Sequence, residues 1–411
     1  MFIYNLLITI FLPLILLRSL YKSLRYGENV NRLLERIALN VVRRPNQEVI
    51  MVHAVSVGEI MASRKFVEEL SSRFPKSKIL FTCTTPSGSE TIKRLFKETV
   101  LHQYLPIDHP FLLEIFLKKW QPKEVFLIEK EIWPNLINKI NSRGINICLV
   151  NGRISKKSFN KYKFYLPLMG KAFGKFKKVV AQGKEDEKRF LDLGVRAENC
   201  SWDYSFKFDS VDFQKQDSEW IKPKDKKIIL CASTHPPEEK MLLEAFDKTK
   251  SREITIVLVP RHPDRTKSIK DIIESFDLSY VIFSKNNFDL DFSKQVILVD
   301  TIGNLESLYA IADIAFIGGT LINHGGQNFL EGVKYGIPLT SGTSTYNFLE
   351  ISKDLQEREI LTTVSKPDEL IPLWEELIEN SLKKDLKEIS ASYLSKRVGA
   401  SQRTLKKILG Q

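Results

Sequence analysis

The segment FIGGTLINHGGQNFLE, residues 316–331, carries two glycine pairs, the first directly after an apolar run and the second at the start of a helical pattern. A strand, a glycine-rich loop and a helix in this order are typical of Rossmann-like domains, which bind ligands beyond the carboxyl ends of their strands. Glycine lets backbone N–H groups approach a phosphate, and a helix N-terminus favours its negative charge. The segment therefore predicts a phosphate site beside Gly319, Gly325 and Gly326, with Glu331 placed to bind ribose hydroxyls.

The rest of the chain repeats this alternation of apolar, strand-like runs with longer amphipathic stretches. Such an order predicts an α/β fold with mainly parallel sheets and helices on both faces. A polar stretch at 207–225 interrupts the alternation, so we expect two doubly wound domains with the ligand cleft between them. The predicted division is an anchor at 1–26, a first domain at 27–215, and a second at 216–411 that includes the C-terminal helices.

Composition supports two separate cores and disfavours several classes of site. The chain has 411 residues, of which 43% are hydrophobic, and single cores usually stop growing at roughly 250–300 residues. Four cysteines lie far apart without a C-x-x-C spacing, which favours a reducing compartment. The histidines show no paired spacing, and the D-x-D triplet at 289–291 lies far from the glycine loops, so we expect no metal site.

The first 17 residues carry no charge and are followed by Arg18, Lys22 and Arg25. This length is near the short limit for crossing a bilayer, and Asn5 and Pro13 weaken the span further. Without a basic segment before the apolar run or a small-residue site after it, cleavage is not expected. We predict an uncleaved anchor, spanning or lodged in one leaflet, with the chain in the cytoplasm. A buried core helix is the alternative.

Net charge is +12, and residues 151–178 hold nine basic side chains and no acidic one, with aromatic residues among them. Such a segment suits an anionic partner, such as an acidic lipid surface or a phosphorylated molecule. No nucleic-acid-binding signature accompanies it, so nucleic acid is not an expected partner. A solvated helix face is the alternative interpretation.

Two carboxylate motifs occur in the first half of the chain. HAVSVGE, residues 53–59, runs from a buried strand into a helix, so Glu59 is either a helix-dipole partner or a general base facing the cleft. IEKEIWPN, residues 128–135, places Glu129 and Glu131 at the end of a strand. If that strand continues, only one of these two carboxylates faces the cleft; the alternative is an ordinary acidic helix start.

In the second half, ASTH and VPRHP follow two successive predicted strands, at residues 232–235 and 259–263. Arg261 is placed to bind a phosphate through two charge-assisted hydrogen bonds from its guanidinium group. Each motif taken singly could also be a strand-end loop.

Together these motifs resemble the 3-deoxy-D-manno-oct-2-ulosonic acid (Kdo) transferases of lipopolysaccharide assembly. The resemblance covers roughly residues 45–350 through HAVSVGE (53–59), TTPSGSE (84–90), YLPIDHP (104–110), IEKEIWPNL (128–136), NGRIS (151–155), ASTHPPEE (232–239), LVPRHPDR (258–265), DTIGNL (300–305) and FIGGTLINHGGQNFLE (316–331). It implies two facing Rossmann-like domains of the GT-B type, and metal-independent, inverting transfer of Kdo from CMP-Kdo to a lipid A precursor. CMP-Kdo is then a donor substrate, and no cofactor is expected.

The resemblance also implies roles for individual residues. Glu59 matches the proposed general base and Glu129 a second essential carboxylate. In the implied mechanism, Arg261 and the glycine-loop amides neutralise the departing phosphate. Acceptor-binding positions are Ser56, Arg153 and Lys207. Donor-binding positions are Ser233, Arg261, His262, Gly303, Gly319, Gly325, Gly326, Asn328 and Glu331.

Two positions depart from the family's pattern: Gln327 stands where a histidine is usual, and Asn304 where an acid is frequent. The implied location is the cytoplasmic face of the inner membrane, anchored by the N-terminus. Two alternatives stay open. One is another nucleotide-sugar transferase or an epimerase of the same fold, which would not need HAVSVGE or IEKEIWP. The other is a non-catalytic membrane-bound scaffold, which would not need Glu59 and Glu129.

Overall fold

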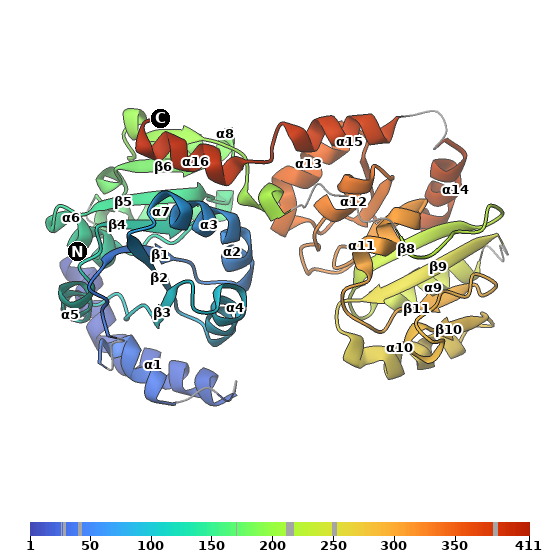
Figure 1. Cartoon of the computed structure of the whole chain (residues 1–411), viewed down its shortest axis with the longest axis horizontal. Helices are drawn as coiled ribbons and strands as arrows, with labels where there is room; N and C mark the ends of the chain where they lie inside the picture. The colour runs from blue at the N-terminus through green and yellow to red at the C-terminus, as the bar shows by residue number, and fades with distance from the viewer. Residues whose placement is uncertain are drawn as a thin grey trace. The chain divides into compact units, whose positions relative to one another are not determined.

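The computed structural model describes residues 1–25, 27, 30–39, 43–169, 171–210, 218–248, 253–380 and 385–411. The chain forms two compact units. The first comprises Met1–Ser210 with Arg397–Gln411, and the second comprises Val211–Lys396. Each contains one seven-stranded sheet, and every strand pair in both sheets is parallel (Figure 1). The predicted α/β class is confirmed.

The first sheet has the strand order β3-β2-β1-β4-β5-β6-β7. Its order reverses between β1 and β4, which is the topological switch point where ligands bind in such folds. Alternate residues of β1 pack into cores on opposite faces: Val49 and Met51 on one, Ile50 and Val52 on the other. The strands are β1 (Glu48–His53), β2 (Ser77–Cys83), β3 (Leu101–Tyr104), β4 (Glu124–Ile128), β5 (Asn146–Gly152), β6 (Lys178–Ala181) and β7 (Cys200–Trp202).

The second sheet has the order β10-β11-β9-β8-β12-β13-β14, with its switch point between β8 and β12. A core on one of its faces includes Ile229, Leu258 and Phe316 from three different strands. The strands are β8 (Lys227–Thr234), β9 (Ile254–Pro260), β10 (Tyr280–Ile282), β11 (Val296–Leu298), β12 (Ile314–Ile317), β13 (Leu339–Gly342) and β14 (Leu361–Val364).

Helices connect the strands in both units. Those of the first unit are α1 (Phe2–Arg25), α2 (Val57–Ala62), α3 (Arg64–Arg73), α4 (Pro86–Phe96), α5 (Pro110–Trp120), α6 (Pro134–Ser142), α7 (Lys156–Tyr165), α8 (Lys184–Asp192) and α16 (Ala400–Leu409). Those of the second are α9 (Glu238–Asp247), α10 (Thr266–Glu274), α11 (Leu305–Ile311), α12 (Leu330–Tyr335), α13 (Leu349–Glu357), α14 (Leu370–Asn380) and α15 (Leu386–Ser395).

The last helix, α16, belongs to the first unit. The predicted domain division assigned all of 216–411 to the second domain and is wrong for this helix. Its apolar residues Ala400, Leu405 and Ile408 complete a core of the first unit. The carboxylate of Asp209 accepts the backbone N–H groups of Gly399 and Ser401 at 2.7 and 2.6 Å and so caps its start. An amphipathic pattern predicts a buried stripe but not which sheet will cover it.

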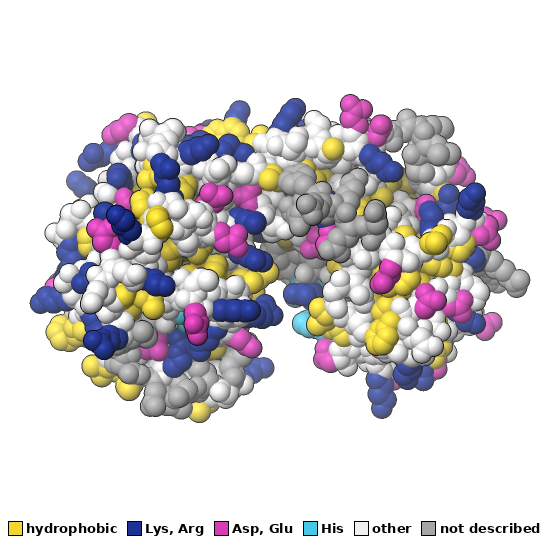
Figure 2. All heavy atoms as spheres, viewed as in Figure 1, with side chains coloured by type: hydrophobic (Ala, Val, Ile, Leu, Met, Phe, Trp, Pro, Cys, Tyr) yellow, Lys and Arg dark blue, Asp and Glu magenta, His cyan; other side chains and the backbone are white. Residues whose placement is uncertain are grey.

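Helix α1 is long and apolar enough to cross a membrane, and it lies against the first unit. One side contacts the domain: Tyr4 donates to Asp108 at 2.8 Å, Thr9 lies 3.2 Å from His109 Nε2, and Leu12 packs on the core. The other side exposes large apolar residues at helical spacing: Ile3, Leu7, Ile10, Leu14 and Leu17. Figure 2 shows hydrophobic side chains on the surface at this end of the first unit.

Some predicted elements differ from the structure. The amphipathic pattern of residues 58–73 predicts one helix, but the segment forms two, α2 and α3, that meet at Ser63. Strands β13 and β14 were not predicted, because each has only four residues and carries threonine or serine in place of a continuous apolar run. The edge strands β3 (LHQY) and β7 (CSW) were not predicted either, because they have only four and three residues and no continuous apolar run.

Candidate active site

The first unit gathers charged residues at the carboxyl ends of β1, β4 and β5, at its switch point. Glu59 follows β1, Glu129 and Glu131 follow β4, and Arg153 follows β5. Lys207, from the short helical turn Phe206–Ser210, lies close enough to Glu129 for their charges to interact. The tertiary structure thus assembles a cluster of three carboxylates and two cations from segments far apart in the sequence.

Glu59 is buried and closes the start of α2 through a capping box. Its Oε2 atom accepts the backbone N–H of Val55 at 2.8 Å and that of Ser56 at 3.4 Å. In return, its own N–H donates to Ser56 Oγ at 3.2 Å. The interpretation of Glu59 as a residue that stabilises the helix start is therefore confirmed. The same bonds fix its carboxylate close to Glu129 and Glu131.

Glu129 stands directly after β4 in the left-handed backbone region, at φ +58°. Burial raises the pKa of its carboxyl group, and the charge of Glu59 raises it further. Lys207 and Arg153 oppose that shift. Asn151 Nδ2 lies 3.5 Å from Glu129 Oε1, at the long limit of a hydrogen bond.

Glu131, for which the sequence predicts no role, belongs to the same cluster. Burial and the charge of Glu59 raise the pKa of Glu131 to about 8. Trp133 Nε1 donates to its Oε2 at 2.9 Å, and His53 Nε2 lies 3.9 Å from the same oxygen. If strand β4 continued through this motif, only one of the two carboxylates would face the site. Because β4 ends at Ile128, this condition is not met, and both acids interact with Glu59.

Two of the predicted acceptor residues, Arg153 and Lys207, belong to this cluster. Ser56 is exposed at the cap of α2. Burial lowers the pKa of Lys207 to about 8, while Glu129 opposes the change. Lys207 therefore stays mostly protonated at neutral pH, and Arg153 acts on it as a second positive charge.

The basic and aromatic stretch at 151–178 divides between surface and interior. Phe173 and Phe176 are core residues. Helix α7 has no buried residue, and Phe164 on it is 78% exposed. Only part of this stretch is therefore available as a surface for a partner.

In the second unit, a cavity of about 220 Å³ lies at the switch point between β8 and β12. Four of the predicted donor-binding residues line it: Ser233, Arg261, Asn328 and Glu331. Gln327 and Tyr309 complete its polar lining. His262, Gly303 and the glycines at 319, 325 and 326 are not among its lining residues.

Glu331 is held in place within this cavity. Asn328 Nδ2 donates to its Oε1 at 2.9 Å, while the Asn328 Oδ1 atom accepts the N–H of Leu330 at 3.1 Å. Burial raises the pKa of Glu331, and the positive charge of Arg261 opposes this rise. A carboxylate and a guanidinium are thus presented together, which suits the hydroxyls and the phosphate of a nucleotide.

The first glycine pair does not present free amides to a phosphate. The buried carboxylate of Glu238 accepts the backbone N–H groups of Gly319, Thr320 and Leu321 at 2.6, 2.9 and 3.0 Å. It accepts the N–H of His235 as well, at 3.0 Å. The predicted use of these amides for the phosphate is therefore wrong for this segment, because an internal anion already occupies them. The ASTHPPEE motif contained Glu238, but its spacing gave no sign of this bond.

The second glycine pair is likewise bonded within the unit. Gly325 N–H donates to Ser344 Oγ at 3.1 Å, and Gly326 N–H donates to the carbonyl of Gly319 at 2.9 Å. Gly325 has φ +90°, and a Cβ there would lie 2.5 Å from the Tyr346 ring, so glycine is required for close packing.

Gln327, the departure from the family's pattern, bonds to a histidine. Its Nε2 atom lies 2.9 Å from His235 Nε2. Burial, followed by the charges of His324 and His262, lowers the pKa of His235 to about 4. The neutral ring accepts the amide proton, so Gln327 supplies a hydrogen-bond donor without a positive charge.

Within the described ranges, no three His, Cys, Asp or Glu residues are grouped to hold a metal ion. The D-x-D carboxylates cap local turns. Asp289 Oδ1 accepts the N–H of Leu290, and Asp291 Oδ1 that of Ser293.

Similarity to solved structures defines the class of this fold. A glycosyltransferase from Rickettsia africae superposes with a TM-score of 0.58 at 15% identity, covering 89% of this chain and 99% of that one. Together with the two parallel sheets, this likeness shows the GT-B fold of glycosyltransferases.

Sequence relatives narrow the class. A family model described as 3-deoxy-D-manno-octulosonic-acid transferase (kdotransferase) matches residues 31–210. A 3-deoxy-D-manno-octulosonic acid transferase of Haemophilus influenzae is 33% identical, covering 98% of this chain and 97% of its own. One from Rickettsia bellii is 31% identical, covering 99% and 97%. The chain belongs to the 3-deoxy-D-manno-octulosonic acid transferase family, which confirms the resemblance noted in its motifs.

Proposed function

We propose that this protein transfers Kdo from CMP-Kdo to a lipid A precursor, with inversion at the anomeric carbon. The observation that carries the proposal is the cluster of Glu59, Glu129 and Glu131 with Arg153 and Lys207 at the switch point of the first unit. Relatives that bear the transferase name across the length of the chain support the donor sugar. The acceptor and the stereochemical course rest on the proposal alone.

In the proposed reaction, a hydroxyl oxygen of the acceptor attacks the anomeric carbon of Kdo. The bond from that carbon to the phosphate oxygen breaks, and CMP leaves with the electron pair. Glu59 takes the hydroxyl proton as general base. Glu131, whose pKa is about 8, holds its own proton at neutral pH and so limits the negative charge around Glu59. Arg153 and Lys207 bind anionic groups of the acceptor.

On the donor side, Arg261 neutralises the phosphate of the departing CMP through charge-assisted hydrogen bonds. Glu331, oriented by Asn328, binds the ribose hydroxyls. Ser233 lines the same cavity and supplies a hydroxyl. No cofactor enters this scheme, and CMP-Kdo is consumed as a substrate.

We further propose that α1 attaches the protein to the cytoplasmic face of the inner membrane. Its exposed apolar side and the basic residues Lys22 and Arg25 in its last turn support this location. The lipid acceptor is reached at that surface.

The test is transfer from CMP-Kdo to a tetraacylated lipid A precursor, followed by mass spectrometry, for wild type and Glu59→Gln. Glutamine keeps an acceptor oxygen for the Val55 amide, so the helix start is retained while the base is lost. We expect kcat to fall by roughly 10²–10⁴-fold, with the unfolding midpoint nearly unchanged. Glu90→Gln, at an exposed position in α4, is the matched control. Full transfer by the Glu59→Gln protein would show that Glu59 is not the general base. Absence of transfer by the wild-type protein would show that the proposed acceptor or the proposed donor is wrong.

A further inference from the structure

A second cavity, of about 920 Å³, opens in the first unit on the edge of the sheet opposite the charged cluster. Its lining includes Asn146 and Ile147, the first residues of β5, and Lys177, which immediately precedes β6. Glu129 and Arg153 belong to the carboxyl edge of the same sheet. Since β5 has seven residues, roughly 20 Å separates the two edges at ~3.3 Å per residue. This cavity is therefore not part of the candidate active site.

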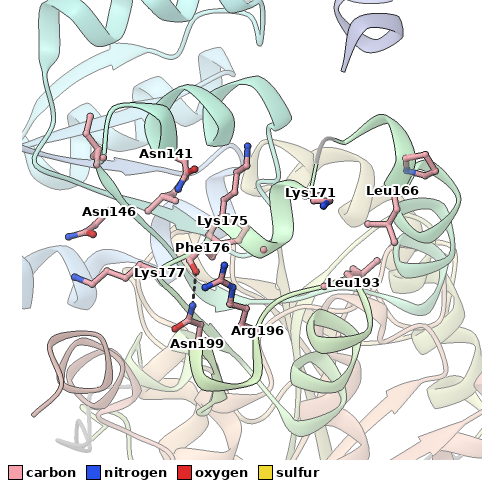
Figure 3. Close-up of a pocket in the computed structure, with 16 residues that line it drawn as sticks. Asn141, Asn146, Leu166, Lys171, Lys175, Phe176, Lys177, Leu193, Arg196 and Asn199 are labelled. Atoms are coloured by element: carbon pink, nitrogen blue, oxygen red, sulfur yellow. Dashed lines mark hydrogen bonds between the residues drawn. The ribbon is translucent and has the colours of Figure 1, made fainter.

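Four cations line the cavity: Lys171, Lys175, Lys177 and Arg196. Figure 3 shows Lys175 and Arg196 beside the backbone of Phe176, with Lys171 across the hollow. None of the lining residues is an aspartate or a glutamate. Each uncompensated cation at a concave surface attracts an anion.

The partners of these cations leave most of the positive charge uncompensated. Lys177 Nζ lies 3.7 Å from Glu124 Oε1, so one charge has an acidic neighbour. Lys175 bonds to the side-chain oxygen of Asn138, which is neutral. In the described ranges of the chain, neither Lys171 nor Arg196 forms an ion pair, and both are exposed. Three positive charges therefore face the cavity without a carboxylate beside them.

The remaining lining suits a polar ligand larger than a lone ion. Gly144 and Gly194 lie on the wall, and a Cβ at either position would meet no atom within 4 Å. Asn199 Nδ2 donates to the Phe176 carbonyl at 3.3 Å, which fixes the wall next to Arg196. Arginine and lysine around an open polar hollow match a phosphate that is part of a larger molecule.

The cavity also adjoins the amino end of α1. Asn138 Nδ2 donates to the sulfur of Met1 at 3.5 Å, while its Oδ1 atom accepts from Lys175. The short helical turn Leu166–Leu168, which contributes Leu166 and Pro167 to the rim, contacts α1. The amino end of α1 therefore lies next to Lys175, one of the cations that line the cavity.

We propose that this cavity is a phosphate-binding site that takes the headgroup of an anionic lipid beside α1. Its distance from the charged cluster makes it a site separate from the one where transfer is proposed. The proposal rests on the proposed attachment of α1 to a membrane, but not on the proposed transfer reaction, in which these residues take no part.

The experiment measures partition of the full-length protein onto vesicles of phosphatidylcholine, with and without phosphatidylglycerol. The variant is Lys171→Ala with Arg196→Ala, and the matched control is Arg73→Ala with Lys76→Ala. The control removes the same two charges from exposed positions at the end of α3. We expect the partition coefficient of the cavity variant onto phosphatidylglycerol vesicles to fall roughly 30-fold, at ~1 kcal/mol for each basic residue. Its partition onto vesicles of phosphatidylcholine alone should equal that of wild type.

A second arm titrates inorganic phosphate into the same proteins by calorimetry, without vesicles. Binding to wild type that the cavity variant loses, together with no preference for phosphatidylglycerol, would assign a soluble phosphate compound and overturn the lipid headgroup. Equal losses in the cavity variant and the control would overturn the site, since general surface charge would explain both. Unchanged unfolding midpoints in both variants ensure that misfolding is not what is measured.

Discussion

The hydroxyl of Tyr4, in the first turn of α1, donates a hydrogen bond of 2.8 Å to Oδ2 of Asp108. The same carboxylate accepts the backbone N–H groups of Asn135 and Leu136, at 3.0 and 2.8 Å. These two residues open α6, directly after the loop that carries Glu129 and Glu131. One buried carboxylate thus joins the apolar helix to the segment that follows the candidate active site.

Tyr4→Phe is expected to loosen α1 from the first unit while leaving α6 intact. The change removes one hydrogen bond to a charged group, which typically contributes ~1.5–3 kcal/mol, and Asp108 keeps its two backbone partners. Hydrogen exchange should therefore quicken by roughly tenfold or more in α1, with little change in α6. Tyr21→Phe, at a tyrosine that is 66% exposed in the same helix, is the control. Equal exchange in the Tyr4→Phe protein and the control would show that Asp108 does not hold α1.

Glu238→Ala is expected to destabilise the second unit by at least about 3 kcal/mol. It leaves three backbone N–H groups of the first glycine segment without their acceptor, and each unsatisfied buried donor costs ~1–3 kcal/mol. Urea unfolding measures this loss. Glu244→Ala, at a partly exposed position of the same helix with an i,i+4 partner in Lys240, should change stability by less than about 0.5 kcal/mol. A small effect of Glu238→Ala would mean that water replaces the carboxylate.

Glu131 makes the stability of the first unit depend on pH. Its folded-state pKa of about 8 lies above the ordinary value near 4.5. Between these values the unfolded chain releases a proton that the folded protein keeps, so this residue's contribution to stability falls as pH rises from about 4.5 to 8. Glutamine at this position cannot ionise and still offers Trp133 an acceptor oxygen.

Glu131→Gln is therefore expected to be more stable than wild type at pH 8, on the order of 2–4 kcal/mol, and nearly equal to it at pH 4.5. Chemical unfolding at a series of pH values gives this difference directly. The exposed Glu90→Gln protein should follow the wild-type curve throughout. A constant difference between Glu131→Gln and wild type from pH 4.5 to 8 would contradict the raised pKa.

Arg261→Ala is expected to weaken CMP binding roughly 10–100-fold, since a hydrogen bond to a charged group contributes ~1.5–3 kcal/mol. Calorimetry with CMP measures this without the transfer reaction. Removal of the guanidinium should also raise the pKa of Glu331, because Arg261 opposes the effect of burial there. Lys267→Ala, exposed in α10, removes a charge outside the cavity and should bind CMP as wild type does. Unchanged binding by the Arg261→Ala protein would place the phosphate elsewhere.

The class of fold and many of the strands could be read from the sequence. Long apolar runs such as those around Val49 and Ile254 predict buried parallel strands, because such strands are covered on both faces. The four-residue strands β13 and β14 escaped this reading, since their threonines and serines are compatible with loops as well as with a sheet. The assignment of α16 to the first unit was also out of reach, because its cap is Asp209, nearly two hundred residues away.

Some residues of the candidate site could likewise be predicted from the sequence, and others could not. The motifs, together with the family resemblance, brought out Glu59 and Glu129 in the first domain and Arg261 and Glu331 in the second. In each domain, polar residues at strand ends converge at one edge of the parallel sheet. Local spacing could not show that Glu131 joins the carboxylate cluster, since this depends on the left-handed backbone at Glu129, where the strand stops.

By itself, the sequence determined the two α/β domains, the apolar N-terminal helix and the family, since these depend on local periodicity and on motifs read along the chain. Only the tertiary structure decided which hydrogen-bond donors are free. The amides of Gly319, Thr320 and Leu321 bind Glu238, and Met1 and Lys175 share Asn138. The physical reason is that a hydrogen bond needs atoms about 3 Å apart, and partners far apart in sequence meet only when the chain has folded.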